Sequence, residues 1–157
     1  MTPRPATPAD LPASARLWHD TWHEAHAHLA APDLVKLRTP GDFAARMAKF
    51  GDDMRVAGPE GAPVGFCVIR EDELYQLFVA PAARGTGLAA ALLADGEARL
   101  AAKGIREAWL DCVIGNDRAL HFYERQGWRL DRREVVEVDT ATGSVPAEVQ
   151  ILLKRLV

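Results

Sequence analysis

The chain has 157 residues, of which 48% are hydrophobic and 26% charged, and its net charge at pH 7 is −3. These values predict one globular domain, residues 1–157, and the negative charge argues against a broad basic surface for nucleic acid. Two cysteines, Cys67 and Cys112, are too few for a disulfide framework or a zinc ribbon and favour a reducing compartment. The first residues have no apolar signal core, and no stretch approaches the roughly 18 apolar residues of a membrane span. We therefore expect a cytoplasmic protein without a membrane or nucleic-acid partner.

The first third of the chain predicts an edge strand followed by helices. Residues 2–6 contain two prolines, which restrict a strand to a sheet edge. Thr7 and Pro8 are typical of a helix start, and apolar residues then recur at intervals of three and four as far as Leu29. This stripe predicts one long helix, or two helices joined near Asp20.

A break is expected at residues 31–33, where Pro32 stands between Ala31 and Asp33. A further helix begins at Thr39 and turns Phe43, Met47 and Phe50 inward.

The middle of the chain predicts an antiparallel meander that leads into a helix. Three strands are expected, at residues 54–57, 63–70 and 73–79. A helix should follow from about Thr86 to Lys103, with Gly104 as its C-cap.

The remaining elements complete a mixed sheet. We expect a strand at 106–114, a helix at 117–126 capped by Asn116, and strands at 128–138 and 148–156 joined by a hairpin at 139–144. The strand–helix–strand unit in the centre should form a parallel pair by a right-handed crossover. The predicted fold class is therefore α/β (α+β): a mostly antiparallel sheet of about six or seven strands, with a central β–α–β unit and helices on both faces.

A glycine-bearing loop between the strand at 73–79 and the following helix is the strongest functional signal. Free backbone N–H groups and the positive end of a helix dipole meet there, as in phosphate-binding loops. A Walker loop is excluded because no Lys-Ser or Lys-Thr follows Gly87. A dinucleotide fingerprint is excluded because Arg84 and Ala89 stand where its first and third small residues belong. By itself, the loop is equally well explained as a strand-to-helix turn that requires glycine.

Two motifs in the correct order indicate a family. Arg84-x-x-Gly87-x-Ala89 resembles the (Gln/Arg)-x-x-Gly-x-(Gly/Ala) signature that binds the coenzyme A pyrophosphate in the GNAT superfamily of acyl-CoA-dependent N-acyltransferases. The segment Asn116-x-x-Ala119-x-x-Phe122-Tyr123-x-x-x-Gly127-Trp128 resembles the second signature of that superfamily, with Trp in place of the final Phe. The resemblance covers essentially the whole chain and is specific from residue 73 to residue 128.

The resemblance implies acetyl-CoA as the acyl donor and suggests which residues hold it. The pantetheine arm would pair with the backbone of Phe78 and Val79, where the central strands splay apart, and one of these N–H groups would face the thioester oxygen. Such a donor lowers a barrier by about 3 kcal/mol. The expected donor-binding residues are Phe78, Val79, Arg84, Gly85, Thr86, Gly87, Leu88, Ala89 and Asn116.

Two residues are candidates for proton transfer. Tyr123 matches the tyrosine of the family that can protonate the leaving thiolate, although it could instead only pack against the acyl chain. Glu73 matches the strand position where some members carry a glutamate base that acts through water, although it could instead be a solvated carboxylate. Tyr75 should share the face of Glu73. Cys112 is better explained as a small core residue than as a covalent nucleophile, which favours direct transfer in a ternary complex.

A histidine-rich segment in the first helical region is consistent with more than one role. His19, His23 and His26 are spaced to share a helical face, and His28 follows. Metal binding is an alternative, but no further ligand is evident, and we expect no metal. The segment either forms a solvated face or lines the acceptor pocket, for which Trp22, His23 and Tyr75 are the candidates.

The sequence therefore predicts an N-acetyltransferase acting on a primary amine of a small molecule or peptide. The alternative is a non-catalytic acyl-CoA-binding sensor with the same fold. The last strand, around Val149 to Leu153, is a sheet edge that can pair in a homodimer.

Overall fold

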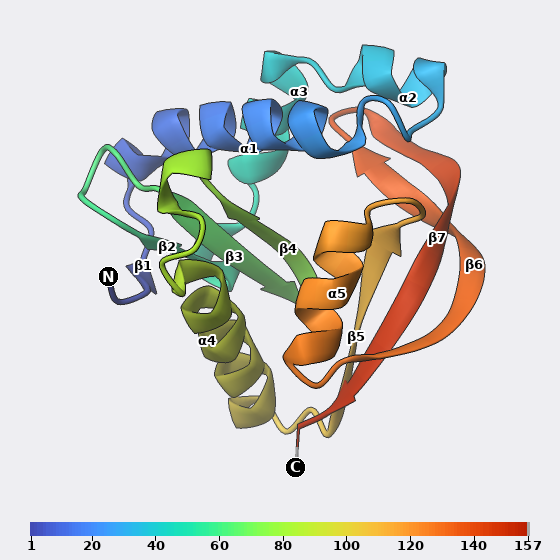
Figure 1. Ribbon diagram of the computed structural model, residues 1–157. Coiled ribbons are helices and arrows are strands. Elements are labelled where there is room, and N and C mark those ends of the chain that lie inside the picture. The colour runs from blue at the N-terminus through green and yellow to red at the C-terminus, as the bar shows by residue number, and fades with distance from the viewer. Residues whose placement is uncertain (157) are drawn as a thin grey trace.

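The centre of the molecule is a sheet of seven strands in the order β1-β2-β3-β4-β5-β7-β6 (Figure 1). The computed structural model describes residues 1–156, so Val157, at the end of the predicted domain, lies outside the described residues. Neighbouring strands run antiparallel, except that β4 and β5 are parallel. The predicted mixed, mostly antiparallel sheet with a central β–α–β unit is confirmed.

The bounds of the elements follow the predicted order. The strands are β1 (Arg4–Pro5), β2 (Met54–Ala57), β3 (Gly65–Arg70), β4 (Glu73–Val79), β5 (Glu107–Val113), β6 (Arg129–Thr140) and β7 (Gly143–Arg155). The helices are α1 (Leu11–His26), α2 (Pro32–Leu37), α3 (Pro40–Met47), α4 (Leu88–Ala102) and α5 (Asp117–Arg125).

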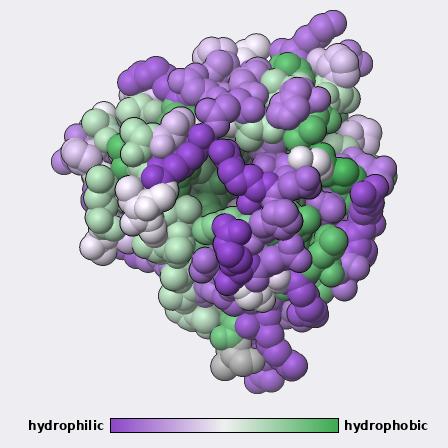
Figure 2. All heavy atoms as spheres, viewed as in Figure 1, coloured by the Kyte–Doolittle hydropathy of each residue, from purple (hydrophilic) through white to green (hydrophobic). Residues whose placement is uncertain are grey.

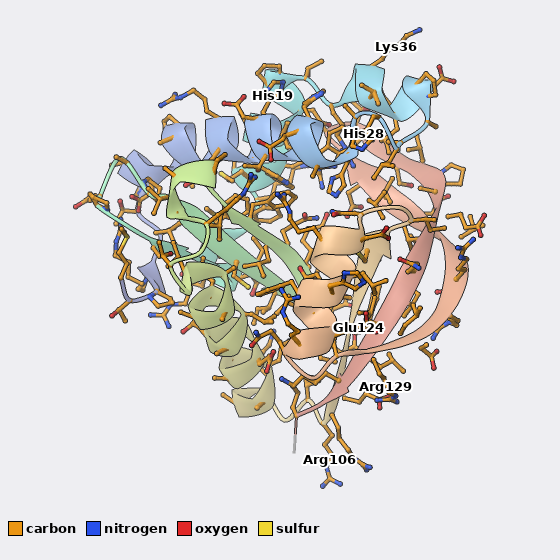
Figure 3. The ribbon with its side chains drawn as sticks, viewed as in Figure 1. His19, His28, Lys36, Arg106, Glu124 and Arg129 are labelled. Atoms are coloured by element: carbon orange, nitrogen blue, oxygen red, sulfur yellow. The ribbon has the colours of Figure 1, made fainter. Side chains whose placement is uncertain are left out.

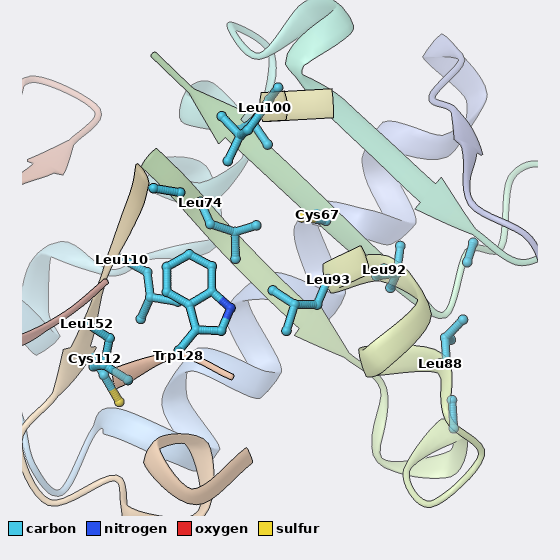
Figure 4. Close-up of a cluster of buried hydrophobic side chains, with 14 residues drawn as sticks. Cys67, Leu74, Leu88, Leu92, Leu93, Leu100, Leu110, Cys112, Trp128 and Leu152 are labelled. Atoms are coloured by element: carbon cyan, nitrogen blue, oxygen red, sulfur yellow. The ribbon is translucent and has the colours of Figure 1, made fainter. Parts of the chain in front are cut away.

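Helices cover both faces of the sheet because strand β3 is apolar on both sides. Phe66 and Val68 belong to one buried cluster with Trp18 of α1 and Phe43 of α3. The alternating residue Cys67 belongs to a second cluster with the leucines of α4 (Figure 4). Helix α4 lies very close to the sheet at Gly96, where an added Cβ would stand 2.8 Å from Cys67 Sγ. This close approach fixes the start of α4 relative to the end of β4.

Strands β4 and β5 separate along most of their length. Their only paired position among the described residues is Glu73 opposite Trp109. On the other side β4 remains paired with β3 as far as Val79, with an irregularity where Ile69 pairs with Leu74 and Val68 pairs with Gln76. This register leaves Tyr75 as an extra residue, which is a β-bulge. Beyond Glu73, β4 therefore presents an edge to the gap that Figure 1 shows between β4 and β5.

Three expectations about local structure are wrong, and so is the expectation that the last strand is a sheet edge, because β7 lies between β5 and β6. Pro32 does not simply break the chain; it occupies the first turn of α2, where its missing N–H costs nothing. Of the two arrangements expected for the apolar stripe, the single helix is confirmed, because α1 has no joint near Asp20. Helix α4 begins at Leu88 rather than at about Thr86. The C-terminal hairpin turns at Ala141 and Thr142, so its strands extend through residues 139, 140 and 143–147, which were predicted as a loop or left unassigned.

Candidate functional site

A cavity of about 670 Å³ opens where β4 and β5 separate. The space-filling view shows this hollow between α4 and α5 and below α1 (Figure 2). One half of its wall comes from the loop before α4, from β4 and from α5. The other half comes from α1 to α3 and from the β6–β7 hairpin. We call these the donor half and the acceptor half, after the roles that the sequence predicts for them.

The donor half is built around the loop between β4 and α4. Gly85 and Gly87 have φ angles of 76° and 84°, in the left-handed region that side chains disfavour. Open space surrounds both positions, so the backbone angle and not crowding requires glycine. The hydroxyl of Thr86 turns away and donates to the Ala83 carbonyl. The loop therefore offers backbone N–H groups at the start of a 15-residue helix, which is the chemistry that binds phosphate oxygens.

Side chains around this loop are already engaged. The guanidinium of Arg84 pairs with Glu24 of α1. Asn116 caps α5, because its Oδ1 accepts from the Ala119 N–H at 3.3 Å. Its Nδ2 lies 3.2 Å from His26 Nε2. These contacts join α1, the loop and α5 around the cavity.

Tyr123 of α5 faces the cavity together with Cys112 of β5. Burial raises the pKa of Tyr123 well above its usual range, so the phenol keeps its proton at every physiological pH. Burial also raises the pKa of Cys112 to about 12, with smaller contributions from Asp111 and Asp117. A protonated thiol is a poor nucleophile. At this point of the wall, both the phenol of Tyr123 and the thiol of Cys112 are therefore protonated at neutral pH.

Two carboxyl groups line the cavity near the end of the gap where β4 and β5 still pair. Glu73 begins β4 and is only 4% exposed, while Asp111 lies on β5; both line the cavity. Burial, helped by the negative charge of Asp111 and opposed by the charge of Arg70, raises the pKa of Glu73 to about 8. Burial raises the pKa of Asp111 to about 6. A carboxyl that titrates near neutral pH is suited to general-base catalysis.

A chain of polar contacts, partly exposed at Arg70 and Asp139, connects Glu73 to the acceptor half. Arg70 reaches Glu73 Oε1 at 3.3 Å with one terminal nitrogen and Asp139 Oδ2 at 2.7 Å with the other. The hydroxyl of Tyr75 donates to the same Asp139 oxygen at 2.5 Å. Arg46 donates to the Tyr75 hydroxyl at 3.2 Å. Residues of α3, β3, β4 and β6 are therefore held in one arrangement around the cavity.

The rings of His19 and His23 lie close together, with their centres 4.4 Å apart, but each ring has its own hydrogen-bond partner. His19 pairs with Asp20, and His23 Nε2 donates to the Arg38 carbonyl at 2.7 Å. His19 and His28, labelled in Figure 3, lie well apart. Within residues 1–156, no group of three or more His, Cys, Asp or Glu side chains could hold a metal ion.

His26 is the histidine that lines the cavity. Burial lowers its pKa to about 4, helped by the nearby charges of His28 and Arg38, so the ring is neutral at pH 7. Asn116 uses Oδ1 as the helix cap, which turns its amide N–H toward His26 Nε2. Nε2 is then the acceptor, and Nδ1 carries the proton without a protein partner.

The structure brings most of the predicted site residues to one cavity. Those on its wall are Glu73, Tyr75, Phe78, Val79, Arg84, Gly85, Gly87, Leu88, Ala89, Asn116, Tyr123 and Trp22. Thr86 and His23 are not on the wall that the described residues form.

The sequence did not single out several residues that line the cavity: His26, Arg38, Arg46, Arg70, Asp111 and Asp139. Two signals were available. Asp111 is a charged residue between Leu110 and Cys112 in a predicted strand. Since burying an unpaired charge is costly, such a residue indicates a cavity beside the strand. Arg38, Asp42 and Arg46 follow each other at intervals of four, the spacing of side-chain pairs on a helix.

The family model of the acetyltransferase (GNAT) family matches residues 14–128. An uncharacterised N-acetyltransferase of Mycobacterium tuberculosis is 33% identical over 96 residues, which cover 55% of this chain and 62% of that protein. An uncharacterised N-acetyltransferase of Mycobacterium bovis matches with the same values. The chain thus spans less than two thirds of the length of these curated relatives.

Solved structures share the fold over nearly the full chain. A GCN5-related N-acetyltransferase from Rhodopseudomonas palustris has a TM-score of 0.75 at 21% identity, over 99% of this chain and 96% of that one. A putative acetyltransferase from Salmonella typhimurium, solved with acetyl-CoA, has a TM-score of 0.73 at 17% identity, over 100% and 94% of the two chains. An N-acetyltransferase from Thermoplasma acidophilum, solved with coenzyme A, has a TM-score of 0.71 at 17% identity, over 98% and 97%.

Proposed function

Since this chain belongs to the GNAT family of acetyltransferases, we propose that it moves the acetyl group of acetyl-CoA directly to a primary amine of a small molecule or peptide. One observation carries the proposal: a phosphate-binding type of loop, a protonated phenol and a buried carboxyl with a pKa near 8 line the same cavity. Fold neighbours solved with coenzyme A or acetyl-CoA support the choice of donor.

The donor site fits a pyrophosphate linked to a long polar arm. The N–H groups of the loop from Arg84 to Ala89, at the start of α4, would bind the pyrophosphate oxygens. The edge of β4 beyond Glu73 has no strand partner on the β5 side among the described residues, so the arm can hydrogen-bond there as an added strand does. Acetyl-CoA supplies the reactive thioester when it is bound.

The backbone N–H of Phe78 or Val79 would face the thioester oxygen and stabilise the negative charge that develops on it. One fixed donor of this kind is worth about 3 kcal/mol of barrier. Phe78 suits this role because its ring packs on Phe66, with ring centres 5.9 Å apart, which holds the strand in place.

Proton transfer would use Glu73 and Tyr123. Ionised Glu73 takes a proton from the ammonium form of the acceptor, directly or through water, so that the nitrogen lone pair can attack. Tyr123 donates its proton to the departing sulfur. Each transfer contributes about 10²–10⁴-fold to the rate. The raised pKa of Cys112 favours this direct route over an acyl-cysteine.

The test is a panel of primary amines assayed with acetyl-CoA by thiol release, with the acetylated product identified by mass spectrometry. We expect transfer to nitrogen by the wild type and a severe loss of kcat in Glu73→Gln. Glu71→Gln, which changes an exposed carboxylate two residues earlier, is the matched control and should keep its activity. Binding of acetyl-CoA without transfer to any amine would instead identify a non-catalytic acyl-CoA sensor.

A further inference from the structure

The acceptor half contains two arginines that are almost completely buried. Arg38, which follows α2, is 4% exposed, and Arg46 of α3 is 7% exposed; both line the cavity. Aromatic rings support them, because the Arg38 guanidinium lies 5.5 Å from the centre of the Trp22 ring and that of Arg46 lies 4.4 Å from the centre of the Trp18 ring. Buried arginines at the end of a cavity require an explanation, since a buried charge is costly unless it is paired.

The pairing of these arginines is incomplete. Both lie near one carboxylate oxygen, Asp42 Oδ2, at 3.1 Å from Arg38 and 3.6 Å from Arg46. The other Asp42 oxygen accepts from the backbone N–H of Ala141. Two positive charges thus share one negative charge. Burial and the charge of Arg46 lower the pKa of Arg38, against the opposing effect of Asp42.

Part of each guanidinium has no partner among residues 1–156. Arg38 bonds only through Nη1, to Asp42 Oδ2 and to the Asp139 carbonyl at 2.6 Å. Its Nε is buried without a hydrogen-bond partner, and so is the Nε of Arg46. The Nη2 of Arg38 makes no hydrogen bond to these residues and, unlike Nε, is not shut off from the cavity, so it is free to donate to a carboxylate oxygen.

The positive and negative groups are therefore distributed unevenly between the two ends of the cavity. Arg38, Arg46 and Arg70 face the carboxylates of Asp42 and Asp139, which leaves one positive charge in excess at this end. The carboxyls of Glu73 and Asp111 lie at the other end of the contact chain, where the reacting amine must come. The remaining arginines of the wall, Arg84, Arg118 and Arg125, belong to the donor half, and Glu137 is exposed on the hairpin.

We propose that the amine acceptor also carries a carboxylate, which Arg38 binds through its free Nη2 with the support of Arg46, while the amine meets Glu73. This inference rests on the proposed acetyl transfer and names its substrate class: amino acids, or amines of similar size with an anionic end. The carboxylate supplies the missing negative charge, and the polarity of the cavity orients the amine toward the thioester.

The test compares amino acids with their own amides, which keep the shape and lose the charge. Glycine, β-alanine, 4-aminobutyrate and L-alanine are each paired with the corresponding amide, and kcat/KM is expressed per concentration of the ammonium form, which is the form that Glu73 deprotonates in the proposed mechanism. We expect the wild type to prefer at least one acid over its amide by about 10-fold to 100-fold, as hydrogen bonds to a charged group predict. An equal or better rate with every amide would overturn the proposal.

Variants locate the effect. The acid-to-amide ratio should fall to about one in Arg38→Gln and decline in Arg46→Gln, and Arg38→Lys should retain part of it. Arg133→Gln, on the exposed face of β6, should leave the ratio unchanged. Each ratio is measured within one preparation, so a partly unfolded variant does not distort it.

The experiment distinguishes failure of the carboxylate site from failure of the proposed acetyl transfer. Transfer to amines without preference for the acid refutes the carboxylate site and leaves the proposed function standing. If no amine reacts, calorimetric titration of the CoA-loaded protein with the same pairs decides: tighter binding of an acid that requires Arg38 supports the site, and equal affinities refute it.

Discussion

The two halves of the cavity use different chemistry to bind their ligands. The donor half relies on the backbone: a loop with two glycines of positive φ, the start of α4, and a strand edge. The acceptor half relies on buried side chains, with Arg38, Arg46, Tyr75 and Asp139 joined by hydrogen bonds across three segments of the chain. Backbone recognition tolerates almost any side chain that does not block it, whereas the acceptor half depends on the identity of each residue. Substitutions in the two halves should therefore have different signatures.

The largest effect is expected for Gly87→Glu. A carboxylate in the loop would repel the pyrophosphate and occupy its place, so we expect KM and Kd for acetyl-CoA to rise by about 100-fold or more, with the fold retained. Gly104→Glu is the matched control, because Gly104 also has positive φ and open space but ends α4. Equal affinities of the two variants would show that the loop is only a turn.

The next largest effect is expected for Tyr123→Phe. The ring stays in place and only the proton donor is lost, so kcat should fall by about 10²-fold while KM for acetyl-CoA changes little. Initial rates over a range of acetyl-CoA concentrations separate the two parameters. An unchanged kcat would reduce Tyr123 to a packing residue.

A smaller effect is expected on the pH–rate profile. The wild-type rate should rise with pH and level off above the Glu73 pKa of about 8. Asp111→Asn removes a negative charge that raises this pKa, so the rising limb should move to lower pH. Arg70→Met removes a positive charge that lowers it, so the limb should move to higher pH. Shifts in the same direction would contradict the assignment of the limb to Glu73.

The smallest effect concerns stability. Because the folded pKa of Glu73 is raised from 4.5 to about 8, its contribution to stability is full below pH 4.5 and is lost as the pH rises through 8. Glu73→Gln removes this ionisation. The Tm of the variant minus the Tm of the wild type should therefore be higher at pH 9 than at pH 5. A Tm difference that is independent of pH would show that the carboxyl titrates normally.

The same contrast explains what the sequence could predict. The donor half was found because its motif is continuous: Arg84, Gly87 and Ala89 are neighbours, and their backbone conformation follows from local rules. The acceptor half was mostly missed because Arg38 and Arg70 meet Asp139 only after the hairpin folds back over the sheet. The hairpin itself was predicted with strands that were too short, so the approach of Asp139 to these arginines could not be foreseen. Pro32 was taken as a break, which concealed α2 just before Arg38.

The central claim is that the gap between β4 and β5 binds an acyl-CoA, and the most direct measurement is calorimetric titration of the purified protein with acetyl-CoA and, separately, with CoA. We expect one binding site with micromolar affinity for acetyl-CoA. Its affinity for CoA should be similar or weaker. Absence of binding at millimolar concentration would contradict it.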